Sequence, residues 1–396
     1  MQVADVSPRV RHHCDTPYLS VTTTADGIGG AALAALREGF APLHVNDICG
    51  ANVRAVHTIL KCKTFVQDAT TEGYRSAVHK FESDHGIPTV RFFSPECKDN
   101  SSLNKYASPS LNKSRETGGK RLWDSLSYFE AMLDGQPAFI VCEQLPNFRR
   151  TKPYKLMLEA AAREGYHADA FVLHACAFGL PTDRRRLFIV FQRDRYPVGV
   201  ADYLNALHHA GIQRNKSLNL GSWCPESELF WLPLSHDLYT TAPLIVTGDR
   251  LFPSVNTKSA DREQPSYDEY KGGSHPLKER ATDADTTRHT YNKARVMSPR
   301  DICQLQGFPR DWPIASGGMV CRCSDPCKSC ARWGVSKMSA QLGNALPVAS
   351  AQAVFAAIRL TLERARLGDG APLPAKAAES WRPTCASRSV LDEGPA

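Results

Sequence analysis

The sequence lacks the long apolar segments that a membrane-spanning protein needs. Its 396 residues are 42% hydrophobic and 22% charged, and they contain no apolar run of 18 residues. The first residues, MQVADVSPRVRHHCD, have no apolar centre of the kind that a signal peptide carries. We therefore expect a cytoplasmic protein with no membrane partner, long enough for one large core and a second, smaller unit.

A strong charge imbalance and a sign of disulfide bonding are also missing. The formal net charge is +7, which permits a polyanionic partner without requiring one. The thirteen cysteines are scattered through a long chain. Without an export signal, we expect free thiols or metal ligands rather than disulfides.

An alternation of strands and helices is present. Short strand patterns occur at residues 19–24, 42–47, 64–68, 90–93, 138–144, 169–174 and 187–192, and helical patterns separate most of them. This alternation predicts an α/β fold with an open, Rossmann-like sheet and a ligand across its carboxyl edge. Between residues 194 and 293 the alternation stops, which predicts the smaller domain.

The first strand leads into a glycine-rich turn, ADGIGG, at residues 25–30. Glycines let the backbone approach a ligand, and free amides at the start of the next helix favour an anionic group. A plain tight turn explains the motif equally well. Asp47 and Asp68 end the next two strands, where carboxylates can bind nucleoside hydroxyls, although either one alone could be a helix N-cap. Together with the turn they favour a nucleoside cofactor.

A single thiol, Cys97, follows the strand Val90 to Phe93 in the segment FFSPECKDNSS. An isolated cysteine in a reduced protein is more often a buried structural residue than a nucleophile. The motifs around it favour a nucleophile, since Glu143 ends a later strand and a GNA turn lies further on. The polar stretch 98–119 is either a basic lid for phosphates or a solvated loop.

Three arginines, Arg184 to Arg186, precede a strand. Residues i and i+2 of an extended segment point to the same side, so Arg184 and Arg186 could converge on one ligand while Arg185 faces away. An exposed basic patch is the alternative.

Four cysteines lie close together in CRCSDPCKSC, with the spacing C-x-C-x3-C-x2-C. Four thiolates at this spacing can surround one tetrahedral Zn(II), with four free thiols in a loop as the alternative. We expect a structural zinc site made by Cys321, Cys323, Cys327 and Cys330.

The ordered motifs ADGIGG, VND, VQD, SPEC, CEQLPNF, GLPTDRRRLFIV, MSPRDICQLQGFP and SAQLGNALPVASAQAV resemble those of the C5-cytosine-specific DNA methyltransferases, over nearly all of residues 19–360. The resemblance implies a Rossmann-like, S-adenosylmethionine-dependent methyltransferase sheet with a smaller target-recognition domain. It also implies methyl transfer to C5 of a flipped cytosine in double-stranded DNA through a covalent intermediate at Cys97.

The resemblance assigns the site residues. The catalytic set is Cys97, Glu143, Arg184 and Arg186. The S-adenosylmethionine site is lined by Ala25, Gly27, Ile28, Gly29, Gly30, Asp47, Ile48, Asp68, Asn344 and Ala345.

Four positions depart from the pattern of that family. Glu96 separates Pro from the thiol, Ala25 replaces an aromatic residue, Gln144 replaces Asn, and Thr182 stands where Gln is usual. Lys98 lies beside the thiol, where it could accept a carboxylated cofactor analogue. Two alternatives follow: a C5-pyrimidine transferase that acts on RNA or with a modified donor, and a catalytically silent DNA-binding homologue.

The sequence patterns and the resemblance together give the expected organisation. We expect a mobile N-terminal lead at 1–18, a catalytic and cofactor-binding α/β domain at 19–194, a small target-recognition domain with the four-cysteine insertion at 195–335, the C-terminal part of the catalytic domain at 336–367 and a disordered tail at 368–396. The expected partner is double-stranded DNA. A monomer and a cognate restriction system are further expectations.

Overall fold

The structure is a computed structural model. It describes residues 19–96, 120–194, 196–219, 222, 229–232, 244–247, 252–253, 295–296, 299–316, 319–321, 342 and 345–383. Statements about contacts and burial concern these residues.

A seven-stranded sheet forms the centre of the molecule, in the order β3-β2-β1-β4-β5-β8-β6. Its strands are β1 Ser20–Thr24, β2 Ala41–Asn46, β3 Lys63–Phe65, β4 Val90–Phe93, β5 Phe139–Gln144, β6 His167–His174 and β8 Arg185–Gln192. Strand β8 runs antiparallel to both β5 and β6, whereas the pairs from β3 to β5 are parallel. The predicted α/β fold with an open Rossmann-like sheet is confirmed.

The order of the strands places a topological switch between β1 and β4. The chain builds β1, β2 and β3 outward to one side and then returns to place β4 on the other side of β1. In open α/β sheets the crevice at the carboxyl ends of such strands is where ligands bind. The glycine-rich turn follows β1, and the segment that leads to Cys97 follows β4. The switch therefore brings these two motifs together.

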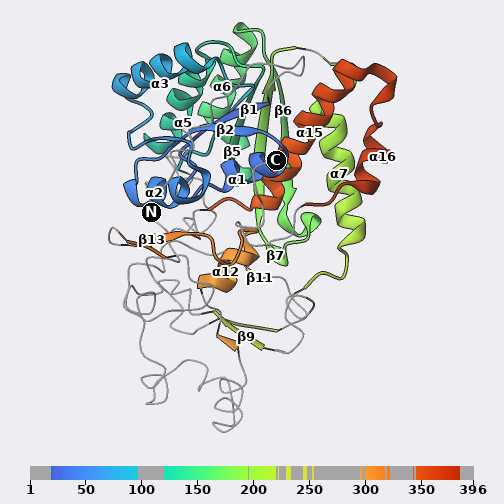
Figure 1. Cartoon of the computed structure of the whole chain (residues 1–396). Coiled ribbons are helices and arrows are strands. Elements are labelled where there is room, and N and C mark those ends of the chain that lie inside the picture. The colour runs from blue at the N-terminus through green and yellow to red at the C-terminus, as the bar shows by residue number, and fades with distance from the viewer. Residues whose placement is uncertain are drawn as a thin grey trace, which may run out of the picture.

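Helices cover both faces of the sheet (Figure 1). On one side are α3 Glu72–His85, α5 Lys120–Leu133 and α6 Lys152–Arg163. On the other are α1 Gly30–Arg37, α7 Val200–Arg214, α15 Val348–Leu367 and α16 Pro374–Ser380. Helices α3 and α6 begin at threonine caps, because Thr71 and Thr151 accept hydrogen bonds from the backbone N–H of Tyr74 and Tyr154 at 3.4 and 3.3 Å. Helix α2 Gly50–Leu60 follows β2.

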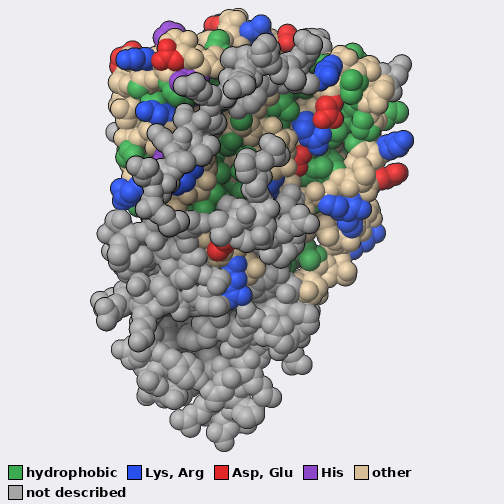
Figure 2. All heavy atoms as spheres, in the orientation of Figure 1, with side chains coloured by type: hydrophobic (Ala, Val, Ile, Leu, Met, Phe, Trp, Pro, Cys, Tyr) green, Lys and Arg blue, Asp and Glu red, His purple; other side chains and the backbone are tan. Residues whose placement is uncertain are grey.

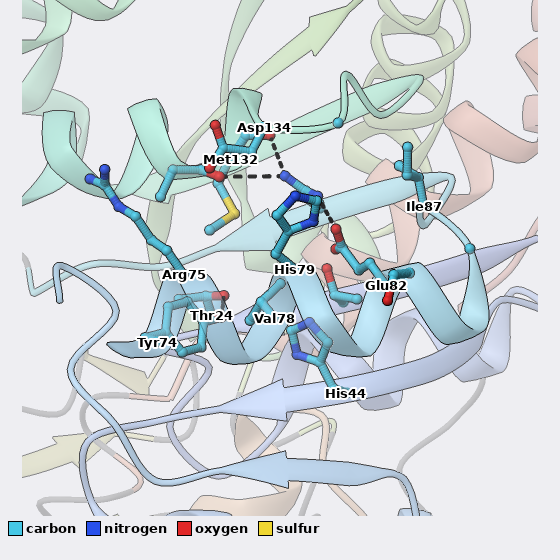
Figure 3. A pocket seen from close by; sticks show the side chains of 16 residues that line it. Thr24, His44, Tyr74, Arg75, Val78, His79, Glu82, Ile87, Met132 and Asp134 are labelled. Carbon is cyan, nitrogen blue, oxygen red and sulfur yellow. Dashed lines mark hydrogen bonds and ion pairs between the residues drawn. The ribbon is translucent and has the colours of Figure 1, made fainter. Parts of the chain in front are cut away.

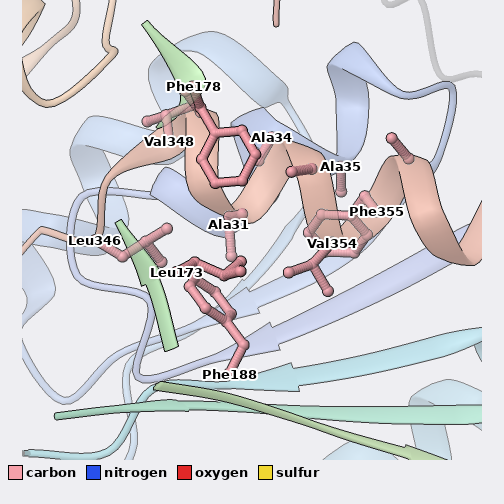
Figure 4. Packing of buried hydrophobic residues seen from close by; sticks show 14 of the residues in the cluster. Ala31, Ala34, Ala35, Leu173, Phe178, Phe188, Leu346, Val348, Val354 and Phe355 are labelled. Carbon is pink, nitrogen blue, oxygen red and sulfur yellow. The ribbon is translucent and has the colours of Figure 1, made fainter. Parts of the chain in front are cut away.

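The largest apolar core lies between the sheet and helices α1 and α15. Ala31, Ala34 and Ala35 of α1 pack in one cluster with Val354 and Phe355 of α15 (Figure 4). The small alanine side chains of α1 let the two helices approach closely, so the apolar stripe of each helix is buried. A second cluster lies under α5 and α6.

Short elements complete the described chain. They are η3 Pro146–Arg150, η4 Ala175–Phe178, β7 Thr182–Asp183, β9 Leu229–Leu232, β10 Leu244–Thr247, β11 Phe252–Pro253, β12 Arg295–Val296, α12 Pro299–Leu305, β13 Ile314–Ser316, β14 Met319–Cys321 and η6 Gly368–Gly370. Strands β10, β9 and β12 form a separate three-stranded sheet. No helix in the described ranges is long and apolar enough to cross a membrane.

The expected boundary at residue 195 is wrong for α7. Val200, Tyr203, Leu204 and Leu207 are buried in the main core, and their i, i+3, i+4, i+7 spacing makes one apolar face. This face packs with α15, so α7 belongs to the α/β domain rather than to the small domain.

The expectation of a disordered tail from residue 368 is also wrong for residues 368–383. Helix α16 buries Ala377 and Ala378, and the indole N–H of Trp381 donates to Glu38 at 3.1 Å. Arg214 donates to the Ala378 carbonyl at 3.1 Å. Alanines are small enough to pack closely on α7, so a segment of low hydrophobicity is ordered by tertiary contacts.

Candidate active site

The turn after β1 uses the left-handed backbone region three times. The φ angle is 55° at Ala25, 58° at Gly27 and 85° at Gly29. A Cβ on Gly29 would lie 2.6 Å from Cγ2 of Val56, so this position requires glycine for space as well as for conformation. The turn closes where the Gly29 N–H donates to the Asp26 carbonyl at 3.0 Å.

Asp26 caps helix α1 from within the turn. Its carboxylate accepts hydrogen bonds from the backbone N–H groups of Ala31 at 2.8 Å and Ala32 at 3.0 Å. Burial raises the pKa of this carboxyl to about 7, against the lowering effect of the two amides. The expectation that amides at this helix start are free for an external anion is therefore wrong for these two. Sequence reasoning missed the role of Asp26, because an Asp in a turn before a helix does not by itself show whether it caps the helix or leaves the amides free for a ligand.

Asp47 joins the end of β2 to the glycine turn. One carboxylate oxygen accepts from the Gly27 N–H at 2.9 Å, and the other accepts from Cys49 N–H at 2.8 Å and from the Asn52 amide at 3.2 Å. Burial raises the pKa of Asp47, and these donors oppose that shift. Asp47 thus fixes the turn, and Ile48 directly after it is 70% exposed.

The end of β3 presents a similar pair. Asp68 accepts hydrogen bonds from the N–H and hydroxyl of Thr70 at 2.9 and 2.8 Å, and Val66 before it is 53% exposed. Exposed apolar side chains at the ends of two neighbouring strands offer a surface that a planar apolar ring would cover. The carboxylates of Asp47 and Asp68 follow the same two strands.

Glu143 is held at the end of β5 by two polar side chains from neighbouring strands. One carboxylate oxygen lies 3.0 Å from Nε of Arg186 on β8, and the other accepts from the Ser94 hydroxyl at 2.5 Å. Glu143 and Arg186 are 5% and 8% exposed. Ser94 is a contact that sequence reasoning missed, although its place in SPEC at the same sheet edge was a usable signal.

Gln144 holds the segment that precedes Cys97. Its side-chain amide donates to the Pro95 carbonyl at 3.0 Å, and Gln144 is fully buried. On the other side the Ser94 N–H donates to the Thr24 carbonyl at 3.1 Å. Residues 94 and 95 are thus fixed between β1 and β5, whereas Glu96 is exposed.

The arginine triplet separates into different contacts. Arg184 is 1% exposed, and its guanidinium donates to the Ala345 carbonyl at 2.6 Å. Arg186 contacts Glu143, as described above, so the two guanidinium groups have different partners. Arg185 faces outward, with its side chain 63% exposed and its Nε 3.7 Å from Asp183. The alternation predicted for the triplet is present.

Two segments distant in sequence pack on the glycine turn. The indole N–H of Trp312 donates to the Ile28 carbonyl at 2.9 Å, and the Ile28 side chain is buried in the core. A Cβ on Gly30 would lie 3.1 Å from Leu346 and 3.2 Å from Phe308, so this glycine permits the close approach of both segments.

Several predicted site residues lie outside the described residues. They are Cys97, Asn344, Cys323, Cys327 and Cys330. Cys321 ends β14. Within the described part of the chain no group of three or more His, Cys, Asp or Glu side chains is arranged to hold a metal ion. On the face in Figure 2, basic, acidic and hydrophobic side chains are interspersed where side chains are described, so charge there does not mark a binding surface.

Solved structures confirm the fold. A methyltransferase of Entamoeba histolytica, EhMeth, superposes with a TM-score of 0.56 at 14% identity, over 89% of this chain and 100% of that chain. The Dnmt2 methyltransferase of S. pombe superposes with a TM-score of 0.53 at 14% identity, over 88% and 99% of the two chains.

Two sequence comparisons identify the family. Among curated proteins, the Type II methyltransferase M.HgiDI of Herpetosiphon aurantiacus is 24% identical over 358 residues, which are 88% of this chain and 96% of that protein. The family model described as C-5 cytosine-specific DNA methylase matches residues 24–359. This span includes the glycine turn, Glu143, the arginine triplet and most of α15. The chain therefore belongs to the C-5 cytosine-specific DNA methylase family and is an enzyme, a DNA (cytosine-5-)-methyltransferase.

Proposed function

We propose that this enzyme methylates C5 of a flipped cytosine in double-stranded DNA through a covalent intermediate at Cys97. The observation that supports this most is the setting of Glu143, which Ser94 and Arg186 hold beside the segment that leads to Cys97. A positioned carboxyl group next to a thiol is the pair that addition to a cytosine ring requires.

Each side chain then has a defined part in the chemistry. The Cys97 thiolate forms a bond to C6, the C5–C6 double-bond pair shifts to form a C4–C5 double bond, and the C4–N3 double-bond pair moves onto N3. Glu143 contacts N3 and stabilises the ring as C5 becomes nucleophilic. Arg186 orients Glu143. Once C5 carries the methyl group, a base removes the C5 proton, the electrons restore the double bond and the thiolate leaves C6.

The carboxyl edge of the sheet fits S-adenosylmethionine, on which this enzyme family depends. Ile48 and Val66 offer exposed apolar surface for the adenine ring, and Asp47 and Asp68 have carboxylates for polar groups of the nucleoside. When bound, the cofactor supplies an electrophilic methyl group. At Gly27 a Cβ would meet nothing within 4 Å, so this glycine leaves the open side of the turn free of a side chain.

The target base has to leave the duplex, because neither Cys97 nor Glu143 can reach C5 or N3 within stacked base pairs. We assign target recognition to the region between α7 and α12, which contains the separate sheet of β9, β10 and β12. The polar stretch 98–119, which lies outside the described residues, stays the predicted lid over the flipped base.

A trapping experiment tests the proposal. DNA with 5-fluorocytosine should form a covalent adduct with the parent in the presence of S-adenosylmethionine, because fluorine at C5 blocks the last elimination. Cys97→Ala should form no adduct while it still binds S-adenosylhomocysteine. Cys49→Ala is the matched control, since Cys49 is an exposed thiol at the start of α2. An adduct with Cys97→Ala would refute the role of Cys97.

The trapping assay, together with an assay for methyl transfer, separates the alternatives. An enzyme for RNA would transfer tritiated methyl groups to RNA in preference to DNA, and nucleoside analysis would find the label in its cytosines. A silent DNA-binding homologue would bind DNA and form no adduct. A modified donor would be indicated by cofactor binding and thiol addition without transfer of a plain methyl group.

Structural zinc at Cys321, Cys323, Cys327 and Cys330 stays a proposal. Metal analysis of reduced protein prepared without chelator should find one zinc per chain, and the absence of zinc would refute the proposal.

The monomeric state is tested by light scattering. A role beside a cognate restriction nuclease is tested by whether methylation at the mapped target sequence protects DNA from a nuclease encoded nearby.

A further inference from the structure

A row of polar side chains crosses the middle of the sheet on the face below α3. His44 of β2, Thr22 of β1 and Arg91 of β4 are paired in register, so they lie side by side across three strands. They are 1%, 2% and 3% exposed. Central parallel strands normally bury apolar residues on both faces. Three polar residues in register are therefore a local exception within the sheet.

Helix α3 covers this row with polar groups of its own. Arg91 forms an ion pair with Glu82 of α3, and its other guanidinium nitrogen donates to the carbonyls of Met132 at 3.0 Å and Ala131 at 3.4 Å. Nε of Arg91 and Oε1 of Glu82 are buried and have no hydrogen-bond partner among the described residues. One donor and one acceptor are thus left for another molecule.

His44 supplies another pair of unused groups. Both ring nitrogens are buried and have no hydrogen-bond partner in the described part of the chain. Phe65 and Phe81 meet the ring edge to face at centroid distances of 5.2 and 5.6 Å. Burial and the nearby Arg91 lower the pKa of His44 to about 3, so the ring is neutral and offers one donor and one acceptor.

These groups line a cavity of about 670 Å³ between the sheet, α3 and the end of α5. Figure 3 shows its side chains, with His44 from the sheet and Tyr74, Val78 and Glu82 from α3. Met132 and Ile87 add apolar wall. The volume falls in the range of small-molecule pockets, which combine apolar walls with a few convergent polar groups. A buried polar group without a hydrogen-bond partner is unfavourable, so several of them favour a bound polar molecule.

The lining defines the chemistry of the ligand. Two arginines, Arg75 and Arg91, are balanced by two carboxylates, Glu82 and Asp134, so the lining favours neither an anion nor a cation. The unused groups include both donors and acceptors, and aromatic and apolar side chains surround them. A planar molecule with donors and acceptors on its edge matches this set.

We propose that the cavity below α3 binds an uncharged nitrogen heterocycle of nucleobase or nucleoside size. The site is separate from the proposed catalytic site, because His44, Thr22 and Arg91 lie before the carboxyl ends of their strands, whereas Glu143 lies at the carboxyl end of β5 and the segment that leads to Cys97 follows β4. The inference does not depend on the methyl transfer reaction.

Binding is tested with full-length protein saturated with S-adenosylhomocysteine, which closes the cofactor site to competing nucleosides. Adenine, hypoxanthine, cytosine, uracil and their four nucleosides are the probes, measured by saturation-transfer NMR and calorimetry. The parent should bind at least one of them. The same titration with Glu143→Gln should give the same affinity, because binding at the catalytic site would change and binding below α3 would not.

His44→Phe should weaken that binding about tenfold, because the ring keeps its packing and loses both nitrogens. Glu82→Gln is a second variant with the same shape, and it should also weaken binding. His209→Phe on α7 is the matched control and should bind as the parent does. Thermal unfolding confirms that each variant is folded. Absence of binding by the parent, which would mean a water-filled cavity only, or unchanged binding by both His44→Phe and Glu82→Gln would overturn the proposal.

Discussion

Helices α15 and α3 cover opposite faces of the same sheet with different kinds of side chain. Helix α15 buries thirteen of its 20 residues, most of them apolar. Helix α3 has 14 residues and buries only Tyr74 and Glu82. The first face meets α1, α7 and α16 in one apolar cluster, whereas the second covers a polar row and a cavity.

This difference shows which parts of the fold supply stability and which are free to carry polar groups. The turn after β1 and the segment around Ala345 both rest on the apolar face, through Ile28, Leu346 and α15. The edge of the sheet that carries the proposed catalytic residues is thus positioned by dense packing on one side. On the other side, buried polar groups lower stability unless each is paired.

The largest expected effect is on the apolar face. Phe355 is fully buried and packs on Phe40 and Phe92 at centroid distances of 5.4 and 6.0 Å. Phe355→Ala should lower the free energy of unfolding by about 3 to 5 kcal/mol, through lost burial and a residual cavity. Urea unfolding measures it. A loss well below 1 kcal/mol would show that this face is not the denser one.

The buried ion pair on the other face gives the next effect. Arg91→Leu should lower the free energy of unfolding by about 3 kcal/mol, because it leaves the Glu82 carboxyl buried without its cation. The double variant Arg91→Leu/Glu82→Leu should return to within about 1 kcal/mol of the parent, because no charge is then left unpaired. Urea unfolding of parent, single and double variants tests this. A double variant as unstable as the single one would mean that the pair itself stabilises this face.

The sequence predicted the apolar face well. The run VASAQAVFAAIRL has the apolar content and spacing of a buried helix, and it forms the first part of α15. It also predicted the strands and the edge that they share, because strand ends followed by polar residues are visible in the chain. Local patterns sufficed where burial was apolar and contiguous.

The polar groups on the face below α3 could not be predicted from the same local patterns. His44, Thr22 and Arg91 are single polar residues in three separate strands, and only the register between the strands brings them together. Ser94 and Gln144 gained their roles in the same way, from contacts across neighbouring strands. Helix α16 was missed because its order comes from contacts with α7 rather than from its own composition.

A glycine-to-alanine substitution on each face allows the two faces to be compared directly. A Cβ on Gly211 of α7 would lie 2.1 Å from the Ala177 carbonyl oxygen, whereas a Cβ on Gly73 of α3 would meet nothing within 4 Å. Gly211→Ala should lower the free energy of unfolding by about 1 to 3 kcal/mol, because backbone has to move. Gly73→Ala should raise it by about 0.5 to 1 kcal/mol through helix propensity. Urea unfolding of both variants measures these changes. Changes in the free energy of unfolding with the same sign for both variants would contradict the expected difference between the faces.

The last effect concerns the carboxyl group at the start of α1, on the apolar face. Burial raises the pKa of Asp26 from 3.8 to about 7, so the folded protein holds a proton that the unfolded chain releases between these two pH values. This group therefore makes stability fall as pH rises through that window. Asp26→Asn removes the titration and keeps the shape, so the stability of the variant relative to the parent should rise by about 1 to 2 kcal/mol between pH 5.5 and 7.5.

Urea unfolding of the two proteins at several pH values measures this difference, because groups common to both cancel. Asp202→Asn is a suitable control for the loss of a carboxylate at a helix start, since Asp202 accepts from the Gly199 N–H at 2.8 Å at the start of α7. A difference between Asp26→Asn and the parent that stays constant across the range would mean that the Ala31 and Ala32 amides keep Asp26 ionised. In that case the apolar face would hold a permanent buried charge, and its contrast with the face below α3 would be one of packing density and not of charge.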